Sequence, residues 1–367
     1  MRRLLPLLLI ALVAGCGQAG GASSALGFTM HAGAVQFPAD GDWVASNVGL
    51  KALVPVGGCV LGIGNYANGY REVTANWTGD AGCTSLKIDP APGSDSFGRN
   101  TGGNGWRGGG LDAVAAVPGP NGSVVGVGTE FGRREADGTL VRLAGLDGQL
   151  RPTALARSGT NLVAVGTASL GSSTSPVAWV SADEGKSQRT VVMPVAGGAN
   201  VASGPWSVAA AGPELLAVGY SNPHLQIWAS HDGGGSWTVS ELPTSSDKKL
   251  VYGILPVSGQ WLLYGETNDG SLQTPFVVIG KPGAWSTVDV PGPGGVVAGT
   301  LDAHGVPVLA ARTMEPHDRF CSSVLVPEGS AWQRGDLGCS GSPVTAAATL
   351  ADGRVLLAGN RDLWLRP

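Results

Sequence analysis

Charged and aromatic side chains gather in a set of loops that follow short apolar segments of this 367-residue chain. The arginines among them carry planar, permanently charged guanidinium groups, which bind carboxylates and other polar ligands through paired hydrogen bonds. Such a mixed, arginine-rich set favours a polar ligand or a protein partner over a lipid, and solvated loops without a ligand are the open alternative. The candidate ligand-binding residues are Tyr70, Arg71, Glu130, Arg133, Tyr220, Glu266, Arg312, Asp318, Arg319 and Arg361.

Other kinds of chemistry have no complete motif in the sequence. The histidines form no HExxH pair, and no GxSxG elbow marks a serine hydrolase. Gly103, Gly105 and Gly108 match GxGxxG, but outside the strand-to-helix context that a dinucleotide site needs. His317, beside Asp318 in one of the loops, is the histidine that we would test first. We therefore predict no metal and no cofactor, and we assign no catalytic residue.

A short apolar run that ends in a small residue recurs seven times and sets the expected architecture. Periods of about 46 residues are typical of propellers and other repeat folds. Most copies follow a second apolar run and a turn, so each unit is expected to open with a β-hairpin. The copies end at Gly64, Gly128, Gly166, Gly219, Gly265, Ala311 and Gly359.

Aromatic residues repeat in step with these runs, as the series Trp179, Trp228, Phe276, Phe320 and Trp364 and the series Trp237, Trp285 and Trp332. Two aromatic positions for each apolar run indicate four short strands per unit. We predict an all-β fold, a seven-bladed β-propeller of four-stranded antiparallel blades. The last unit ends after three strands, and residues 31–37 are expected to supply its outer strand and close the ring.

One unit carries a motif that resembles a known family. Ser230, Asp232, Gly234, Ser236 and Trp237 fit the pattern S-x-D-x-G-x-[ST]-W, and a degenerate copy begins one unit earlier at residue 181. The pattern resembles the Asp-box of the sialidase-like (BNR repeat) propellers. The resemblance implies that these residues form a structural turn between third and fourth strands, away from any active site. It extends over the blade pattern from about residue 40 onward, although the motif occurs in two units.

The same resemblance provides the alternative function, a sialidase-like glycoside hydrolase or a carbohydrate-binding propeller. Catalytic members combine an Arg-Ile-Pro strand, three arginines for the substrate carboxylate, a Tyr/Glu pair and an acid/base Asp. This sequence has no Arg-Ile-Pro. Arg71, Arg312 and Arg361 fall in loops where a triad could assemble, and Tyr220 and Glu266 occupy matching repeat positions, but no motif supports any of them.

The N-terminus determines the expected location. Residues 1–15 combine two arginines with an apolar run, which indicates a secretory signal too short to span a membrane. The end of this run and Cys16 resemble the lipobox of bacterial lipoproteins, so we expect lipidated Cys16 as the mature N-terminus; an ordinary cleaved signal is the alternative. Residues 16–27 are then a flexible tether and residues 28–367 a single propeller domain. We expect export and lipid anchoring to a bacterial membrane, facing the periplasm or the cell exterior.

Four further cysteines fit this compartment. Cys59 with Cys83 and Cys321 with Cys339 are the expected disulfides, because export exposes thiols to oxidising conditions. A four-thiolate metal site would need the short CxxC spacing that both pairs lack.

The overall charge limits the kinds of partner. The formal net charge of -4 argues against a nucleic-acid surface, which would be basic. With a complete scaffold and no complete catalytic set, the sequence predicts a non-catalytic recognition or assembly platform that binds a protein or a glycan on its loop face.

Overall fold

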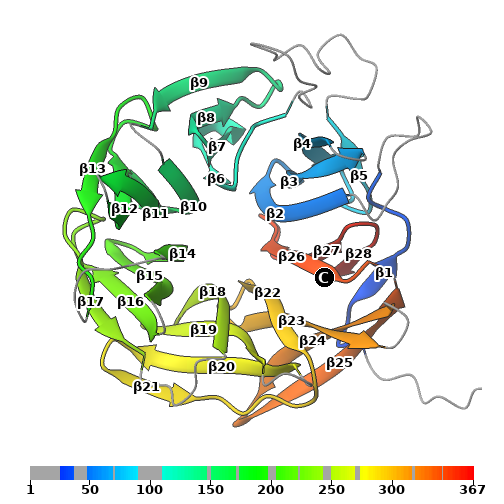
Figure 1. Cartoon of the computed structure of the whole chain (residues 1–367). Coiled ribbons are helices and arrows are strands. Elements are labelled where there is room, and N and C mark those ends of the chain that lie inside the picture. The colour runs from blue at the N-terminus through cyan, green and yellow to red at the C-terminus, as the bar shows by residue number, and fades with distance from the viewer. Residues whose placement is uncertain are drawn as a thin grey trace, which may run out of the picture.

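The computed structural model describes residues 25–36, 48–68, 71–89, 110–146, 150–170, 173–196, 204–221, 224–242, 249–268, 273–315, 319–340 and 342–367. Over these ranges the chain forms 28 strands and one short 3-10 turn, Pro120–Gly122. The strands make seven four-stranded antiparallel sheets that surround a central axis (Figure 1). The predicted seven-bladed β-propeller is confirmed. Among the described residues, no helix is long and apolar enough to cross a membrane.

The first four blades follow one another along the chain. The first contains β2 (Val48–Val56), β3 (Cys59–Asn68), β4 (Arg71–Gly79) and β5 (Leu86–Ile88). The second contains β6 (Ala115–Pro118), β7 (Val124–Val127), β8 (Glu130–Arg134) and β9 (Leu140–Gly145). The third contains β10 (Leu150–Ser158), β11 (Asn161–Leu170), β12 (Ser173–Ser181) and β13 (Arg189–Val192). The fourth contains β14 (Pro205–Ala211), β15 (Glu214–Ser221), β16 (His224–Ser230) and β17 (Thr238–Glu241).

The remaining blades complete the ring. The fifth contains β18 (Lys249–Val257), β19 (Gln260–Asn268), β20 (Gln273–Lys281) and β21 (Ala284–Thr287). The sixth contains β22 (Gly295–Leu301), β23 (Pro307–Glu315), β24 (Arg319–Glu328) and β25 (Ala331–Ser340). The seventh contains β26 (Val344–Thr349), β27 (Val355–Gly359), β28 (Leu363–Arg366) and, on its outer edge, β1 (Thr29–His31).

The first strand of each blade lies innermost, and each inner strand contacts the next around the axis, from β2 through β26 and back to β2 (Figure 1). The apolar runs of the sequence repeat are the second strands. We call the end of the ring where first strands begin and second strands end the upper face, and the opposite end the lower face. Strand order therefore places the turns between second and third strands on the upper face, and the turns between third and fourth strands on the lower face.

Ring closure is confirmed, but with different residues from those expected. Thr29–His31 pairs with β28, with Thr29 opposite Leu365 and His31 opposite Leu363. Gly33 then adopts a positive φ of 65° and donates its N–H to Asp362 Oδ1 at 2.8 Å. After this turn Val35 N donates to Arg361 O of the seventh blade at 2.9 Å, while the same segment bridges to Leu86 of the first blade. The N-terminal segment thus joins the last blade to the first.

Large aromatic side chains fill the layers between blades. Trp77, Trp179 and Trp228 have 0% exposure, and Trp364 has 2%. Indole N–H groups cross to the preceding blade: Trp228 Nε1 donates to Pro194 O at 2.6 Å and Trp364 Nε1 to Leu337 O at 3.0 Å. The expected series is only partly regular. Phe276 lies opposite Gly265, and Phe320 opposite Met314, so both lie nearer the upper face than the tryptophans.

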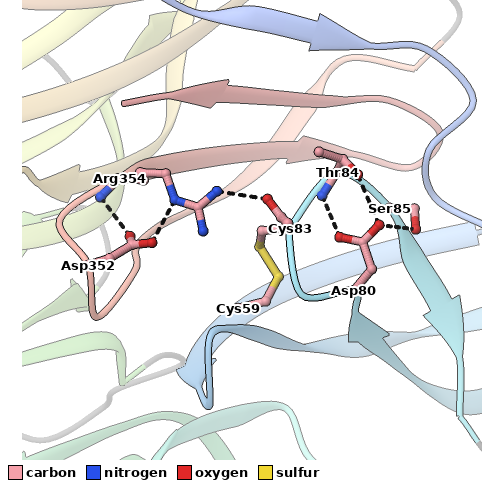
Figure 2. Close-up of a disulfide and its surroundings, with 8 residues drawn as sticks. Cys59, Asp80, Cys83, Thr84, Ser85, Asp352 and Arg354 are labelled. Atoms are coloured by element: carbon pink, nitrogen blue, oxygen red, sulfur yellow. Dashed lines mark hydrogen bonds and ion pairs between the residues drawn. A yellow bond between two sulfur atoms is a disulfide. The ribbon is translucent and has the colours of Figure 1, made fainter.

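Both expected disulfides are present. Cys59–Cys83 lies inside the first blade, and Cys321–Cys339 links directly opposed residues of β24 and β25. Figure 2 shows how Arg354, from the seventh blade, donates to Gly82 O at 2.7 Å beside Cys83, while Asp352 accepts from its Nε at 2.7 Å. The first disulfide therefore lies under a contact that spans the closing junction.

The two disulfides are expected to differ in their rate of reduction. Cys59 and Cys83 are 5% and 0% exposed, whereas Cys321 is half-buried and Cys339 is exposed. Because thiol–disulfide exchange requires access to a sulfur atom, a mild thiol reductant should open Cys321–Cys339 first. Alkylation of the folded protein followed by mass spectrometry measures the order, and equal labelling of all four cysteines would contradict it.

Candidate functional site

Six of the first strands carry a β-bulge at the same place, near the upper face. Each shift in register places one extra residue on the first strand and turns its side chain out of the regular alternation. The bulged residues are Lys51, Thr153, Trp206, Tyr252, Val297 and Thr345. In the second blade, Val114 occupies the corresponding place just before β6. These residues form an inner ring on the upper face.

The bulges explain the glycines that end the repeated apolar runs. A Cβ atom added to Gly166 would overlap the carbonyl oxygen of Arg151, and one added to Gly265 would overlap that of Leu250. Gly64 and Gly219 are in the same position against their own first strands. Because only glycine lacks a Cβ, the repeat glycine is the residue that lets the bulged strand approach.

The residues that directly follow this repeat position form an outer ring. Each lies at the upper end of a second strand, and all seven are polar or aromatic: Asn65, Thr129, Thr167, Tyr220, Glu266, Arg312 and Asn360. Several reach the neighbouring blade. Asn360 Oδ1 accepts from Leu50 N at 3.1 Å, and Thr167 packs against Gly204. The fold therefore fixes where these two rings of side chains lie on the upper face. It does not fix which residue type occupies each position.

The two rings meet as a cluster of aromatic and charged residues on the fourth, fifth and sixth blades. Trp206 and Tyr220 pack together, with ring centroids 4.4 Å apart and planes tilted by 44°. Trp206 Nε1 donates to Val251 O at 2.6 Å, which ties the fourth blade to the fifth. The aromatic pair thus forms a fixed wall beside Tyr252, the next residue of the inner ring.

Glu266 lies at the centre of this cluster and is 2% exposed. Its carboxylate rests on the backbone of Gly295 in the sixth blade, where an added Cβ would collide with Oε2. Gln273 Nε2 donates to Glu266 Oε1 at 3.4 Å. A glycine at position 295 is therefore what leaves room for this acid between two blades.

Tyr252 and Arg312 complete the cluster. Burial, and then the neighbouring carboxylate of Glu266, raise the pKa of Tyr252 to about 12, against the opposing effect of the Arg312 charge. The phenol therefore stays neutral at physiological pH and can donate a hydrogen bond. Tyr252 is 39% exposed, so its ring is accessible from the upper face. We call Trp206, Tyr220, Tyr252, Glu266 and Arg312 the upper-face cluster.

The structure brings together only part of the set expected from the sequence. Tyr220, Glu266 and Arg312 belong to the cluster, while Arg361 is exposed in the turn between β27 and β28, one blade beyond Arg312. Arg319 is exposed at the start of β24. Only the backbone of Arg71 is described, and Tyr70, Asp318 and His317 lie outside the described residues, as does Cys16.

The assignment of Arg133 to an upper-face loop was wrong. The turn between the second and third strands of this blade is short, and β8 already begins at Glu130. Arg133 therefore lies near the lower end of β8, where its guanidinium pairs with Glu135 at 2.6 Å. Glu130 remains on the upper face, and Arg142 binds both of its carboxylate oxygens, at 2.6 and 2.9 Å.

Sequence reasoning missed Trp206 and Tyr252. Both precede the glycine of their own repeat by 13 residues, the distance that also separates Lys51 and Thr153 from theirs. In the other three blades Val114, Val297 and Thr345 precede the repeat position by 14 residues, so the spacing locates the inner ring to within one residue once the bulge is known.

The lower face carries the two turns that match the S-x-D-x-G pattern. In the fourth blade, Gly234 N donates to Ser230 Oγ at 2.9 Å, and Asp232 accepts from the backbone and hydroxyl of Ser236 at 2.9 and 2.7 Å. Gly234 has a positive φ of 91°, and Trp237 is buried between blades. The third blade repeats the arrangement with Ser181, Asp183, Gly185 and Ser187.

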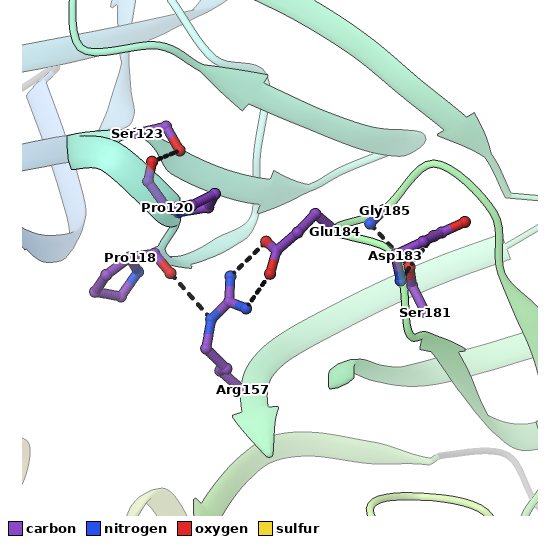
Figure 3. A network of polar contacts seen from close by, with 8 residues as sticks. All are labelled: Pro118, Pro120, Ser123, Arg157, Ser181, Asp183, Glu184 and Gly185. Carbon is purple, nitrogen blue, oxygen red and sulfur yellow. Dashed lines mark hydrogen bonds and ion pairs between the residues drawn. The ribbon is translucent and has the colours of Figure 1, made fainter. Parts of the chain in front are cut away.

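The sequence predicts that charged residues gather in loops on one face, but the lower face carries charged residues as well. Figure 3 shows Arg157 binding both carboxylate oxygens of Glu184, at 2.6 and 2.8 Å, and donating from Nε to Pro118 O of the second blade at 3.1 Å. Because Glu184 lies inside the turn between β12 and β13, this network links two blades across the lower face. The Arg157 network therefore helps to hold the second and third blades together.

The two aspartates of these turns predict an acid-dependent loss of stability. Hydrogen bonds from Ser236 and Ser187 lower the pKa of Asp232 and Asp183 from the ordinary value of an aspartate to about 2. Their ionised forms therefore stabilise the fold above about pH 4, and the contribution is lost as pH falls through about 2. Thermal unfolding between pH 5 and about 2 should show a smaller decline for the Asp183→Asn, Asp232→Asn double variant than for the wild type. Glu241→Gln, an exposed change at the end of β17, should leave the wild-type slope; an equal slope for the double variant would contradict the assignment.

The residues described form no group of three or more histidine, cysteine or acidic side chains that could hold a metal ion. Tyr252, Glu266 and Arg312 offer instead a neutral donor, a buried carboxylate and a cation. Such a set can orient a polar ligand through directional hydrogen bonds.

Comparison with solved structures supports the propeller fold. The chain is similar to streptogramin B lyase, with a TM-score of 0.58, 11% identity, and coverage of 94% of this chain and 99% of that one. It is also similar to the extracellular domain of a putative one-component system from B. thetaiotaomicron, with a TM-score of 0.55, 9% identity, and coverage of 89% and 39%. Both are seven-bladed β-propellers. No protein-family model and no curated protein sequence matches the chain.

Proposed function

We propose that this protein is exported, held at a bacterial membrane by lipidated Cys16, and acts as a non-catalytic recognition platform through its upper face. The leader that precedes Cys16 and the two disulfides support an oxidising compartment outside the cytoplasm. The ring supplies a rigid scaffold, and the lipid keeps it at the membrane.

The observation that carries this proposal is the uneven chemistry of two geometrically regular rings. At the inner positions, Thr153, Val297 and Thr345 are sufficient to build a blade, and at the outer positions Thr167 and Asn360 are. The upper-face cluster replaces such small residues with tryptophan, tyrosine, glutamate and arginine on adjacent blades. Because the fold does not require these larger groups, recognition of a ligand is the better reason for them.

Site-specific photo-crosslinking in the producing cell tests the platform. A photoreactive phenylalanine analogue at Tyr252 should form defined adducts with a partner. The same analogue at Thr345, the equivalent position of the seventh blade, is the matched control. Adducts at both positions alike, or at neither, would contradict recognition by the upper-face cluster.

Anchoring has its own test. The wild-type protein should remain with the membrane fraction in high salt and dissolve in detergent. Cys16→Ser should remove the lipid attachment site and release the exported protein from membranes. A Cys16→Ser protein that is processed and still resists salt extraction would contradict the lipid anchor.

A sialidase-like glycoside hydrolase, or a carbohydrate-binding propeller, is the second candidate. It is supported by the S-x-D-x-G turns and by Tyr252, Glu266 and Arg312, which place a tyrosine, a carboxylate and an arginine together. The test is turnover of sialosides and aryl glycosides by protein lacking the lipid. Activity that Glu266→Gln abolishes and Thr167→Ala, at the equivalent position of the third blade, preserves would establish this function instead.

A further inference from the structure

Exposed apolar side chains are concentrated on the upper face. Of the six large apolar residues that are exposed in the described part of the chain, four lie at the upper ends of first or second strands. These are Val114, Leu250, Tyr252 and Met314, with exposures of 44%, 37%, 39% and 62%. Leu250 and Tyr252 belong to β18, and Met314 lies at the end of β23 in the next blade. Apolar surface is thus directly available beside the upper-face cluster.

Among the described residues beside the upper-face cluster, accessible cations outnumber accessible acids. Arg312 and Lys249 are half-exposed and Arg319 is exposed, whereas Glu266 is 2% exposed and Glu315, opposite Arg319 at the end of β23, is half-exposed. Lys249 Nζ lies over the ring of Phe276, 5.1 Å from its centroid, which holds the ammonium group near the fifth blade. The chain as a whole has a formal net charge of -4, so this local excess of cations is not a consequence of composition.

Carboxylates elsewhere on the upper face are largely occupied. Glu130 is bound by Arg142 through both oxygens. Asp362 is 3% exposed and accepts from Gly33 N. An anionic partner that binds near Arg312 and Lys249 would therefore meet half-exposed Glu315 as the accessible acid of β23, while exposed Glu241 and Asp289 lie at or beyond the outermost strands of the fourth and fifth blades.

The combination of residue types matches the centres of protein interfaces. Aromatic residues, methionine and arginine are enriched there, and tryptophan, tyrosine and arginine contribute most of the binding free energy. A glycan would stack on Tyr252 but would gain little from the aliphatic surface of Leu250 and Met314. The neighbouring cations select among peptides for acidic ones.

We propose that the fourth to sixth blades bind an extended acidic segment of a partner protein, whose carboxylates contact Arg312 and Lys249 and whose apolar side chains cover Leu250, Tyr252 and Met314. The neutral phenol of Tyr252 donates to the peptide or its carboxylates. Buried Glu266 positions Tyr252 from below and does not touch the partner. This inference rests on the proposed recognition function and specifies its ligand.

A displayed library of random linear peptides, selected on the full-length protein without its lipid, tests the ligand class. We expect enrichment of sequences in which aspartate or glutamate lies next to aromatic or aliphatic residues. Binding of a labelled enriched peptide should weaken with rising salt. Arg312→Gln and Tyr252→Ala should each weaken it about tenfold or more.

Two control variants match the two test variants: one removes an arginine charge and the other truncates an inner-ring side chain, both on the seventh blade. Arg361→Gln removes the same charge from the upper face of the seventh blade, and Thr345→Ala alters the equivalent inner position there. Both should bind the peptide as the wild type does. Circular dichroism and the midpoint of thermal unfolding establish that Arg312→Gln and Tyr252→Ala are folded.

The proposal is overturned if no peptide is enriched, if enriched peptides lack acidic residues, or if Arg312→Gln binds them as tightly as Arg361→Gln does. Glycan-array binding that depends on Arg312 would replace the peptide with an acidic glycan. If peptides fail while the photoreactive analogue at position 252 still forms defined adducts, the platform stands and the ligand class is wrong.

Discussion

Deletion of residues 1–36 is expected to lower the free energy of unfolding by about 3 to 6 kcal/mol, the hydrophobic contribution of burying two large side chains. Phe28 and Val35 are 7% and 1% exposed, and both would be lost with β1. The deletion also exposes the edge of β28 and removes the acceptor for Trp77, whose Nε1 donates to Gln36 O at 2.7 Å. A loss of this size is comparable to the whole stability of many domains, about 5 to 15 kcal/mol.

Deletion of residues 1–24 is the matched control, since it leaves β1 and the following turn in place. Both variants should be exported with the same heterologous signal, so that both disulfides form. Urea unfolding followed by tryptophan fluorescence measures the difference. Equal midpoints for the two deletions would show that the seventh blade is stable without its outer strand.

Gly265→Ala is expected to destabilise the protein by about 3 kcal/mol, at the upper end of the range for overpacked cores. The new methyl group would overlap the carbonyl oxygen of Leu250, a backbone atom that cannot rotate away. Relief requires the first strand of the fifth blade to move, and with it the bulge that presents Tyr252. Thermal or urea unfolding measures the loss, and ligand binding should fall with it.

The sixth blade provides a control for this substitution. Ala311 naturally occupies the equivalent repeat position, and the first strand of this blade is instead preceded and begun by glycines, Gly294 and Gly295. Ala311→Gly should therefore cost only about 0.5 to 1 kcal/mol, the entropic penalty of glycine in a strand. If Gly265→Ala is as mild as Ala311→Gly, the steric account of the repeat glycine is wrong.

The features that the sequence predicted well are those that repeat. The seven apolar runs reveal the number of blades because each run must be a buried second strand, and the four cysteines pair within blades as their spacing indicated. Ring closure followed from counting strands. The closing residues were shifted because Gly33 ends the strand early through a turn held by Asp362, a side chain more than three hundred residues away.

The features that the sequence did not predict depend on shifts of one or two residues. A bulge changes the side of a strand on which a side chain lies, and the apolar pattern contains no trace of it. The apolar pattern therefore gave no indication that Trp206 and Tyr252 lie on the upper face. Arg133 was misplaced for a related reason, because the charged strand Glu130–Arg134 resembles a loop in composition. The strands themselves could be predicted from the sequence. Their exact pairing register could not, and that register decides which residues reach the upper-face cluster.

Closure by β1 also constrains the order in which the molecule can fold. Synthesis delivers the N-terminus first, yet β1 has no partner until β28, near residue 366, has followed it. The pairing with the longest separation along the chain is therefore formed last, and contacts of this kind slow folding. Until then β1 is unpaired and each end of the growing arc exposes an apolar sheet face, the conditions in which incomplete folds associate with other chains. The newly made protein thus has an aggregation-prone interval that lasts until its final four-residue strand is available.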